Sequence, residues 1–218
     1  MAEKHALVIS PHPDDLEIGM GGTVAKLVDS GVKIISLVVT DGRRSTSVYG
    51  LSEDELVELR ESEVRESVGI LGIDFLVLLR LRDMKEKKNQ VEFKKELSET
   101  ITRFNPEEIY LPHPEIDKHP THRVVSSITL EAVTETPSHP SKIWCYEVWT
   151  PFPKYERIED ISLQMHVKCA AIEAHRSQVE YKNYTEGIMG LNRYRAVFNE
   201  TAGLSVMEYA EVFMEITP

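Results

Sequence analysis

Short apolar runs rich in Val, Ile and Leu alternate with longer segments of helical pattern through most of this chain. Residues 6–9, 32–40 and 75–79 are clear examples, and a segment with helical spacing of its apolar residues follows each run. Parallel strands that are covered on both faces are continuously apolar, whereas half-exposed strands alternate. The sequence therefore predicts an α/β fold: a doubly wound, mainly parallel sheet with helices on both faces.

Further strands are expected at residues 108–111 and 142–149, and residues 208–216 fit either a helix or a last strand. The expected helices cover residues 18–29, 52–72, 91–104, 122–135, 161–177 and 184–199. We find no linker-like segment and predict one domain over residues 1–218. In a Rossmann-like sheet with strand order 3-2-1-4-5, the first and fourth strands are neighbours, and ligands bind beyond their C-terminal ends.

The charge balance excludes some classes of partner. The chain has 25 Lys and Arg residues against 36 Asp and Glu residues, a net charge of −11. We therefore expect neither a nucleic-acid backbone nor an anionic membrane surface as a partner, because both attract clustered cations. No apolar run approaches the roughly 20 residues of a membrane span. Cys145 and Cys169 lack the spacing of a disulfide framework or a zinc knuckle, so we expect a cytoplasmic protein.

Two loops that carry His and Asp follow the first and fourth expected strands. The first reads Pro-His-Pro-Asp-Asp at residues 11–15, and the second spans residues 112–122. Their candidate side chains are His12, Asp14, Asp15, Asp117, His119 and His122. Because the two strands are expected to be neighbours, both loops should face one cleft.

A catalytic zinc site usually has three His or carboxylate ligands and one open position for water. His12, Asp15 and His122 would supply such a set. Asp14, next to a ligand, could accept a proton from the water, and His119 could flank the site without binding the metal.

Helix capping is the simpler alternative for both loops. Asp14 or Asp15 could cap the following helix, with Glu17 completing a capping box. Residues 120–121 could likewise be an ordinary helix start. The two explanations must hold together and neither accounts for His12, so we favour the metal site.

The glycines of the first loop offer another alternative. Gly-Met-Gly-Gly at residues 19–22 follows a strand, and Asp41 ends the next strand, as in folds that bind dinucleotides. The spacing differs, however, because Val24 stands where the last glycine of that motif belongs. Close packing of the first helix explains these glycines better than a nucleotide-dependent oxidoreductase does. A non-catalytic metal- or sugar-binding module also stays open.

Together these motifs resemble the signature of the LmbE-like, or PIG-L, N-acetylglucosaminyl deacetylases. Residues 11–15 with Gly-Gly-Thr at 21–23, and His-Pro-Thr-His at 119–122, carry the resemblance most specifically. Weaker matches are Arg-Glu-Ser-Glu at 60–63, Leu-Arg-Asp at 81–83 and Ala-His-Arg-Ser-Gln at 174–178. The resemblance runs over most of the chain.

The resemblance implies an enzyme that removes the N-acetyl group from an N-acetylglucosamine-type small molecule, using Zn²⁺ or another divalent ion such as Fe²⁺. It also implies a homo-oligomer, either a trimer or a hexamer. Carried over by position, it implies metal ligands at His12, Asp15 and His122, a general base at Asp14, a residue that stabilises the tetrahedral intermediate or protonates the leaving amine at His119, and sugar-hydroxyl contacts from Arg60 and Asp83.

One position departs from the family pattern. Thr121 stands where the family usually has an Asp beside the catalytic histidine. We expect Asp117 to supply the missing charge, which would keep His119 protonated for its role at the oxyanion.

Other polar and aromatic residues have less distinctive surroundings. We expect His113 at the rim of the pocket, His175 to be buried and hydrogen-bonded, and Trp144 and Trp149 to be core or edge residues. The polar loop of residues 41–45 is expected to cover the pocket.

Overall fold

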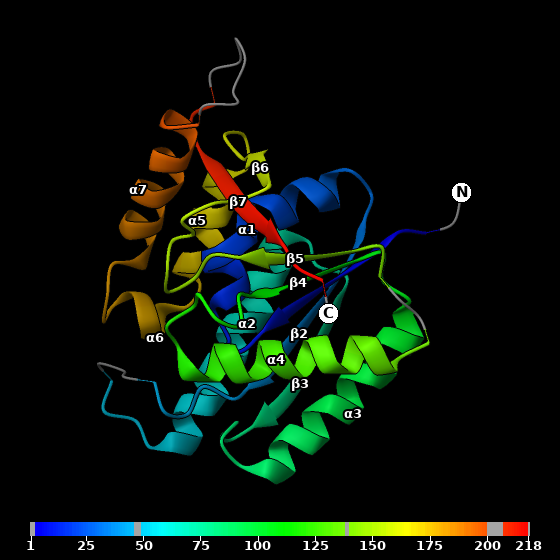
Figure 1. Ribbon diagram of the computed structural model, residues 1–218. Coiled ribbons are helices and arrows are strands. Elements are labelled where there is room, and N and C mark those ends of the chain that lie inside the picture. Colours follow the sequence, from blue (N-terminus) through cyan, green and yellow to red (C-terminus); the bar gives the residue numbers. More distant parts are fainter. Residues whose placement is uncertain (1–2, 46–48, 138–139, 200–206, 218) are drawn as a thin grey trace.

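One seven-stranded sheet forms the centre of the molecule in the computed structural model, which describes residues 3–45, 49–137, 140–199 and 207–217 (Figure 1). The strand order is β3-β2-β1-β4-β5-β7-β6. The strands are β1 (His5–Ser10), β2 (Lys33–Thr40), β3 (Phe75–Leu81), β4 (Glu108–Pro112), β5 (Lys142–Tyr146), β6 (Arg157–Asp160) and β7 (Ala210–Glu215). Strands β1 to β5 run parallel, and β7 pairs antiparallel with β5 and β6. The predicted order 3-2-1-4-5 is confirmed.

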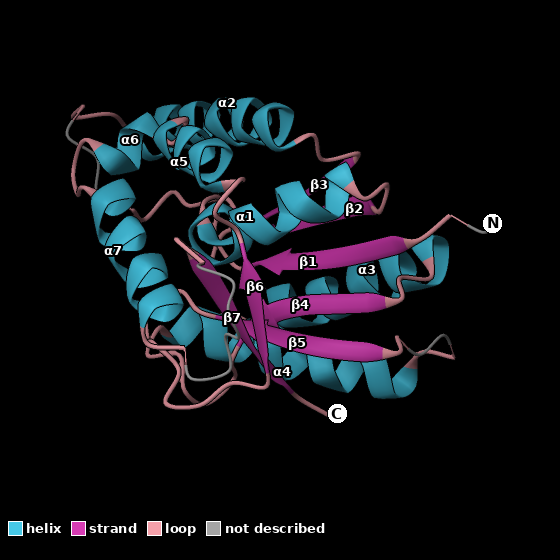
Figure 2. Cartoon of the chain, turned by 90° about the horizontal axis from the view of Figure 1, so that it is seen from above, coloured by secondary structure: helices cyan, strands magenta, loops and turns pink. Residues whose placement is uncertain are grey.

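Helices cover both faces of the sheet, as predicted (Figure 2). The helices are α1 (Asp15–Asp29), α2 (Glu53–Leu71), α3 (Lys87–Phe104), α4 (Pro120–Glu135), α5 (Met165–Glu173), α6 (Arg176–Val179) and α7 (Tyr184–Val197). One face carries α1, α2 and α5, and the other carries α3 and α4. Helix α7 packs against β7 at the end of the sheet far from β3.

Strand β1 shows why the apolar runs are continuous. Leu7 and Ile9 belong to the core cluster on the side of α3 and α4, whereas Ala6 and Val8 belong to the cluster on the side of α1. All four are at most 2% exposed, so neither face of the strand tolerates a polar side chain. The parallel pairing of β1 with β4 brings the loops after both strands to the same edge of the sheet.

Helix α1 is interrupted at Met20, whose φ of −146° and ψ of 22° are not helical. Beyond this point, the backbone N–H groups of Gly22 and Thr23 donate to the two carboxylate oxygens of Glu211 on β7, at 3.0 and 2.7 Å. Lys168 of α5 lies 2.6 Å from the same carboxylate, and both charged side chains are at most 1% exposed. Glu211 therefore caps the second half of α1, and Lys168 balances its buried charge.

This arrangement argues against nucleotide binding at the glycine-rich segment. The amides that would hold a pyrophosphate at a helix N-terminus already bind Glu211. A Cβ on Gly19 would lie 2.2 Å from the Tyr146 ring, and one on Gly22 would lie 2.7 Å from the Ile161 side chain. The glycines therefore serve close packing, the explanation that the sequence favoured.

The predicted helix over residues 161–177 is correct for Met165–Glu173 but wrong in its bounds and continuity. The chain leaves helix α5 after Glu173, and His175 adopts a non-helical ψ of 59° before α6 begins. The break allows the Ser177 backbone N–H and hydroxyl to donate to Glu63 of α2, each at 2.7 Å. Such a long-range hydrogen bond leaves no trace in the local apolar pattern.

The strands near the C-terminal end also differ in part from those predicted from the sequence. The predicted strand over residues 142–149 ends at Tyr146, and of the two alternatives for residues 208–216 the strand is correct. Strand β6 was not predicted, because its sequence Arg-Ile-Glu-Asp has only one apolar residue and is stabilised by pairing with β7. The one-domain boundary 1–218 stays a prediction, and its end residues lie outside the described ranges. Within those ranges, none of the helices has the length and apolar character needed to cross a membrane.

Candidate metal and active site

The loops after β1 and β4 bring three ligand atoms together, as the topology predicts. His12 Nδ1 lies 3.2 Å from Asp15 Oδ2 and 3.0 Å from His122 Nε2, and the last two atoms are 3.1 Å apart. Ligands at about 2.0–2.1 Å from a tetrahedral Zn²⁺ lie roughly 3.3 Å from one another. Burial by itself raises the pKa of Asp15, but His122 and His12 hold it well below its usual range. These side chains could hold one divalent ion.

Asp117 holds the His122 ring from behind. Its Oδ2 lies 3.1 Å from His122 Nδ1, and its Oδ1 accepts the His119 backbone N–H at 2.8 Å. With Nδ1–H directed at this carboxylate, the lone pair of Nε2 is left for an ion. Burial disfavours the charged form of His122, but Asp15 and Asp117 raise its pKa to about 10, so an ion that binds Nε2 displaces a proton from it. The expectation for Asp117 needs correction, because its carboxylate binds the His122 ring and reaches His119 only at the backbone.

The capping alternative fails for the aspartates of the first loop. Asp14 occupies the N-cap position of α1, but its side chain makes no capping hydrogen bond. Asp15 Oδ2 instead accepts the His12 backbone N–H at 2.7 Å. Glu17 is turned towards α2, where it accepts a hydrogen bond from Ser67.

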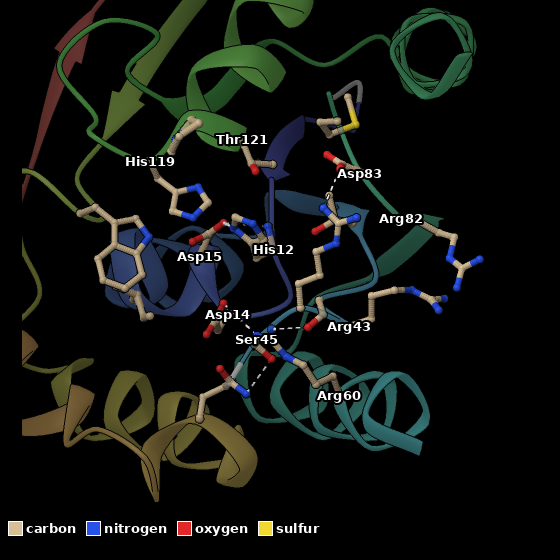
Figure 3. A pocket seen from close by; sticks show the side chains of 18 of the residues that line it. His12, Asp14, Asp15, Arg43, Ser45, Arg60, Arg82, Asp83, His119 and Thr121 are labelled. Atoms are coloured by element: carbon tan, nitrogen blue, oxygen red, sulfur yellow. Dashed lines mark hydrogen bonds and ion pairs between the residues drawn. The ribbon is translucent and has the colours of Figure 1, made fainter. Parts of the chain in front are cut away.

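Arg60 of α2 contacts Asp14 inside the site. Its Nη2 lies 3.1 Å from Asp14 Oδ1, and the arginine side chain is 2% exposed. Figure 3 shows the Arg60 side chain extending from α2 towards Asp14, which lies at the start of α1. The contact fixes the carboxylate while leaving it at the wall of the cavity.

His119 lies on the other side of the ligand cluster, facing His12 (Figure 3). Its ring centroid is 4.7 Å from that of His12 and 4.8 Å from that of His122. One ring nitrogen from each of these histidines lies within 4.8 Å of the other two, so a three-histidine ion site is a second arrangement. Burial, followed by His12 and His122, lowers the pKa of His119 to about 4. The ring is therefore neutral at pH 7, which opposes the expected protonated form.

A cavity of about 450 Å³ opens beside these side chains. Both predicted sugar contacts, Arg60 and Asp83, line it, as do Thr121 and loop residues 42–45. Asp83 Oδ2 accepts a hydrogen bond from Arg44 at 2.6 Å. The Lys85 backbone N–H and then Arg44 lower the pKa of Asp83, so this wall carries a carboxylate at neutral pH.

The sequence interpretation missed the aromatic side of the cavity. Five further side chains line it: Trp149, Gln178, Tyr181, Lys182 and Tyr184. Trp149 was expected in the core or at an edge, but it is half-buried and borders the cavity, whereas Trp144 is 9% exposed and lies in the core. Trp149 follows the C-terminal end of β5, so the rule that marked the loops after β1 and β4 could also have marked this loop.

His113 and His175 are not among the described residues that line the cavity. His113 Nδ1 accepts hydrogen bonds from the backbone N–H groups of Glu115 and Ile116, both at 3.1 Å. This side chain therefore stabilises a turn and does not lie at the rim of the pocket, where it was expected. His175 is 1% exposed, as expected, but in place of the expected hydrogen bond its Nε2 has only an ion-pair contact within the described part of the chain, 3.5 Å from Glu17 Oε1. Burial lowers the pKa of His175, but Glu17 outweighs this effect and raises it above the ordinary value.

Both ligand loops lie within the part of the chain that matches a known protein family. Residues 7–133 match the family described as PIG-L, GlcNAc-PI de-N-acetylase, and this match covers more than half of the chain. The chain belongs to the PIG-L family. The PIG-L match includes His12, Asp15 and His122, whereas Trp149 and helix α7 lie beyond it.

Relatives of this PIG-L chain are named as deacetylases. The diacetylchitobiose deacetylase of Thermococcus kodakarensis is 33% identical over 192 residues, which cover 80% of this chain and 70% of that protein. The probable N-acetyl-alpha-D-glucosaminyl L-malate deacetylase 2 of Bacillus cereus is 27% identical over 187 residues, 82% of this chain and 85% of that protein. The solved N,N′-diacetylchitobiose deacetylase from Pyrococcus horikoshii has a TM-score of 0.84 and 29% identity, covering 98% of this chain and 84% of that chain.

Proposed function

We propose that this PIG-L protein hydrolyses the N-acetyl group of an N-acetylglucosamine-type substrate with the help of a bound divalent ion. The observation that carries the proposal is the position of Asp14, a carboxylate at the cavity wall next to three atoms that are spaced as ligands of one ion. A base beside an ion site is what metal-assisted hydrolysis of an amide requires. The names of the relatives support the substrate class.

His12, Asp15 and His122 hold the ion in this proposal. Their ligand atoms lie 3.0–3.2 Å apart, whereas the nitrogens of the three-histidine arrangement are separated by up to 4.8 Å. We propose Zn²⁺, and Fe²⁺ suits the same His and carboxylate donors. When bound, the ion would polarise the amide carbonyl and make water more acidic at the site.

The remaining steps belong to side chains of this protein. Asp14, held by Arg60 at 3.1 Å, accepts a proton from the attacking water. His119 approaches from the opposite side and donates a ring N–H to the amide oxygen as negative charge develops on it. Asp14, now protonated, then gives this proton to the departing amine, because the neutral His119 ring is too weak an acid to do so. Acetate and a free amino sugar leave the cavity.

Arg60 and Asp83 contact hydroxyl groups of the sugar in this proposal, because both side chains line the cavity. Its volume of about 450 Å³ lies in the lower part of the usual range for small-molecule sites. A homo-oligomer, either a trimer or a hexamer, and a cytoplasmic location stay predictions from the sequence.

The test is acetate release from N-acetylglucosamine, diacetylchitobiose and N-acetylglucosaminyl malate, measured with Zn²⁺-loaded and chelator-treated protein side by side. We expect metal-dependent release from at least one compound. Asp14→Asn is expected to retain the ion and lose about 10²–10⁴-fold of the turnover. Asp74→Asn is the matched control, because Asp74 pairs with Lys33 on the surface and is expected to leave turnover unchanged.

Two results would contradict the proposal. Tight ion binding without acetate release from any of the three compounds would leave only a metal- or sugar-binding module. Full turnover by the Asp14→Asn protein would remove Asp14 from the role of base.

A further inference from the structure

The two tryptophans of the chain lie in different environments. Trp144 of β5 is buried in the core, and its Nε1–H donates to Glu108 Oε1 at 3.1 Å. Trp149, in the loop after β5, is half-buried and lines the cavity. A core position accounts for Trp144, whereas packing alone does not require a large apolar ring at the wall of a polar cavity.

The loop that carries Trp149 is fixed on both sides of this residue. Upstream, Glu147 is 5% exposed, accepts the Phe152 backbone N–H and pairs with Arg195 of α7. Arg195 also donates to the Phe152 carbonyl at 2.8 Å. Next to Trp149, the Thr150 hydroxyl accepts the Lys118 backbone N–H at 3.1 Å. The tryptophan is therefore held in place before any ligand arrives.

The indole ring has contacts on several sides. The His119 ring lies 6.0 Å away at an interplanar angle of 23°, and the Tyr184 ring meets it edge-on at 6.3 Å. The Nζ atoms of Lys118 and Lys182 lie 5.8 and 5.6 Å from the ring centroid, within the range of cation–π attraction. Trp149 thus connects the proposed active-site histidine with the aromatic side of the cavity.

The backbone of Trp149 connects to the ligand cluster as well. Its N–H lies 3.4 Å from Asp117 Oδ2, the same oxygen that contacts His122 Nδ1 at 3.1 Å. The position of the indole ring is therefore tied to that of the proposed ion. A sugar resting on this ring would be placed at a fixed distance from the reacting centre.

The two sides of the cavity differ in chemistry. Figure 3 shows Arg43, Arg82 and Asp83 on the side of His12 that is remote from His119. A pyranose ring has hydroxyl groups around its edge and C–H groups on its faces. Charged side chains suit the edge, and an aromatic ring suits a face. The cavity presents both.

We propose that Trp149 is a specificity-determining and positioning residue: its indole ring stacks on a face of the sugar and keeps the His119 ring in place. The inference rests on the proposed sugar deacetylation. It extends that function to a residue outside the segment that matches the family.

The first experiment separates binding from turnover in Trp149→Ala and Trp149→Phe. We expect Trp149→Ala to raise KM about tenfold through loss of the stacking surface. It should also lower kcat about tenfold, because His119 loses its packing partner. Trp149→Phe, which keeps an aromatic ring, should stay within about threefold of the wild type for both constants. Bound metal should be unchanged in both variants, and Trp144→Phe is the matched control that should retain both constants.

The second experiment uses fluorescence and needs no turnover. Trp144→Phe leaves Trp149 as the only indole, because the chain has two tryptophans. Titration with glucosamine should change the emission of this protein in a saturable way. The same titration should leave the emission of Trp149→Phe, which retains Trp144, unchanged.

The outcomes distinguish this inference from the proposed function. If the wild type deacetylates sugars but Trp149→Ala retains KM and kcat, the inference is overturned and the function stands. If no sugar is deacetylated but Trp149 emission responds to glucosamine, the function fails and the sugar-stacking role stands. Emission that stays constant while glucosamine inhibits turnover would also overturn the inference.

Discussion

The Arg60 guanidinium lies 3.1 Å from the Asp14 carboxylate, and the two side chains are 2% and 14% exposed. The arginine enters the site beneath Gly42, where the backbone has a φ of +70° and a Cβ would lie 2.5 Å from Arg60 Nη1. Glycine is therefore required at this turn for the guanidinium to reach Asp14. Arg60 positions the proposed base, in addition to any contact that it makes with the sugar.

Arg60→Gln should reveal which of these roles dominates. Loss of the ion pair should free the Asp14 carboxylate and lower kcat by about 10²-fold, because a small displacement of a catalytic group has a large effect on rate. If Arg60 mainly binds sugar hydroxyls, KM rises instead while kcat is retained. Steady-state acetate release separates the two constants, and the metal content should equal that of the wild type. Unchanged kcat and KM would contradict both roles.

Asp117→Asn should weaken ion binding. An amide can supply one oxygen, but its NH₂ group must then face either the His122 ring N–H or the His119 backbone N–H. We expect the affinity for Zn²⁺ to fall by about 10- to 100-fold, as is typical when the partner behind a histidine ligand is lost. Competition with a chromophoric chelator measures this change. Glu115→Gln, an exposed change in the same loop, is the control and should retain the affinity of the wild type.

The close packing of α1 predicts opposite effects for two glycine substitutions. Gly19→Ala places a methyl group 2.2 Å from the Tyr146 ring and should lower the free energy of unfolding by about 1–3 kcal/mol. Gly187→Ala in α7 meets no described atom within 4 Å and should raise it by about 0.5–1 kcal/mol, the usual gain from replacing glycine within a helix. Urea unfolding followed by circular dichroism measures both values. Equal effects of the two changes would refute the packing argument.

His175 should make the stability depend on pH. Its pKa is raised above the ordinary histidine value of 6.5 in the folded state, because the nearby Glu17 carboxylate outweighs burial. The folded protein therefore binds this proton more tightly than the unfolded chain does. The resulting stabilisation is complete below pH 6.5 and is lost as the pH rises through the raised pKa.

His175→Gln should accordingly destabilise the protein more at pH 6 than at pH 9. Urea unfolding of the wild type and the variant at both values gives the comparison, and His166→Gln on the exposed side of α5 serves as the control. A destabilisation by His175→Gln that is the same at both pH values would show that the Glu17 contact does not depend on the charge of the ring.

The order of the first five strands could be predicted because local apolar patterns identify the strands and helices, and their alternation identifies the fold class. Strands β1, β2, β4 and β5 are almost wholly buried and the edge strand β3 is half-buried, but each has an apolar run that is visible in the sequence, and helices with their own pattern separate the runs. Strand β6 could not be predicted, since Ile158 is its only apolar residue and pairing with β7 stabilises it. The break at His175 likewise depends on Glu63, a partner more than a hundred residues away.

The candidate site also combines features that the sequence predicts with features that it does not. The adjacency of His12 and His122 follows from the parallel pairing of β1 with β4, and that pairing follows from the fold class. The pairing of Asp117 with the His122 ring requires the three-dimensional course of the loop, as does the place of Trp149 beside His119. Sequence spacing put Asp117 two residues from His119 and so suggested the wrong ring.

Glu211 also has a consequence for the order in which the protein matures during synthesis. Every proposed ion ligand has been synthesised once His122 has been added to the chain, long before the last strand of the sheet. The second half of α1, which begins after the kink at Met20, has no carboxylate at its amides until β7 has been made. We therefore expect a chain that stops after α7 to contain the whole ligand set and yet to bind Zn²⁺ weakly, so that loading with the ion waits for the final strand.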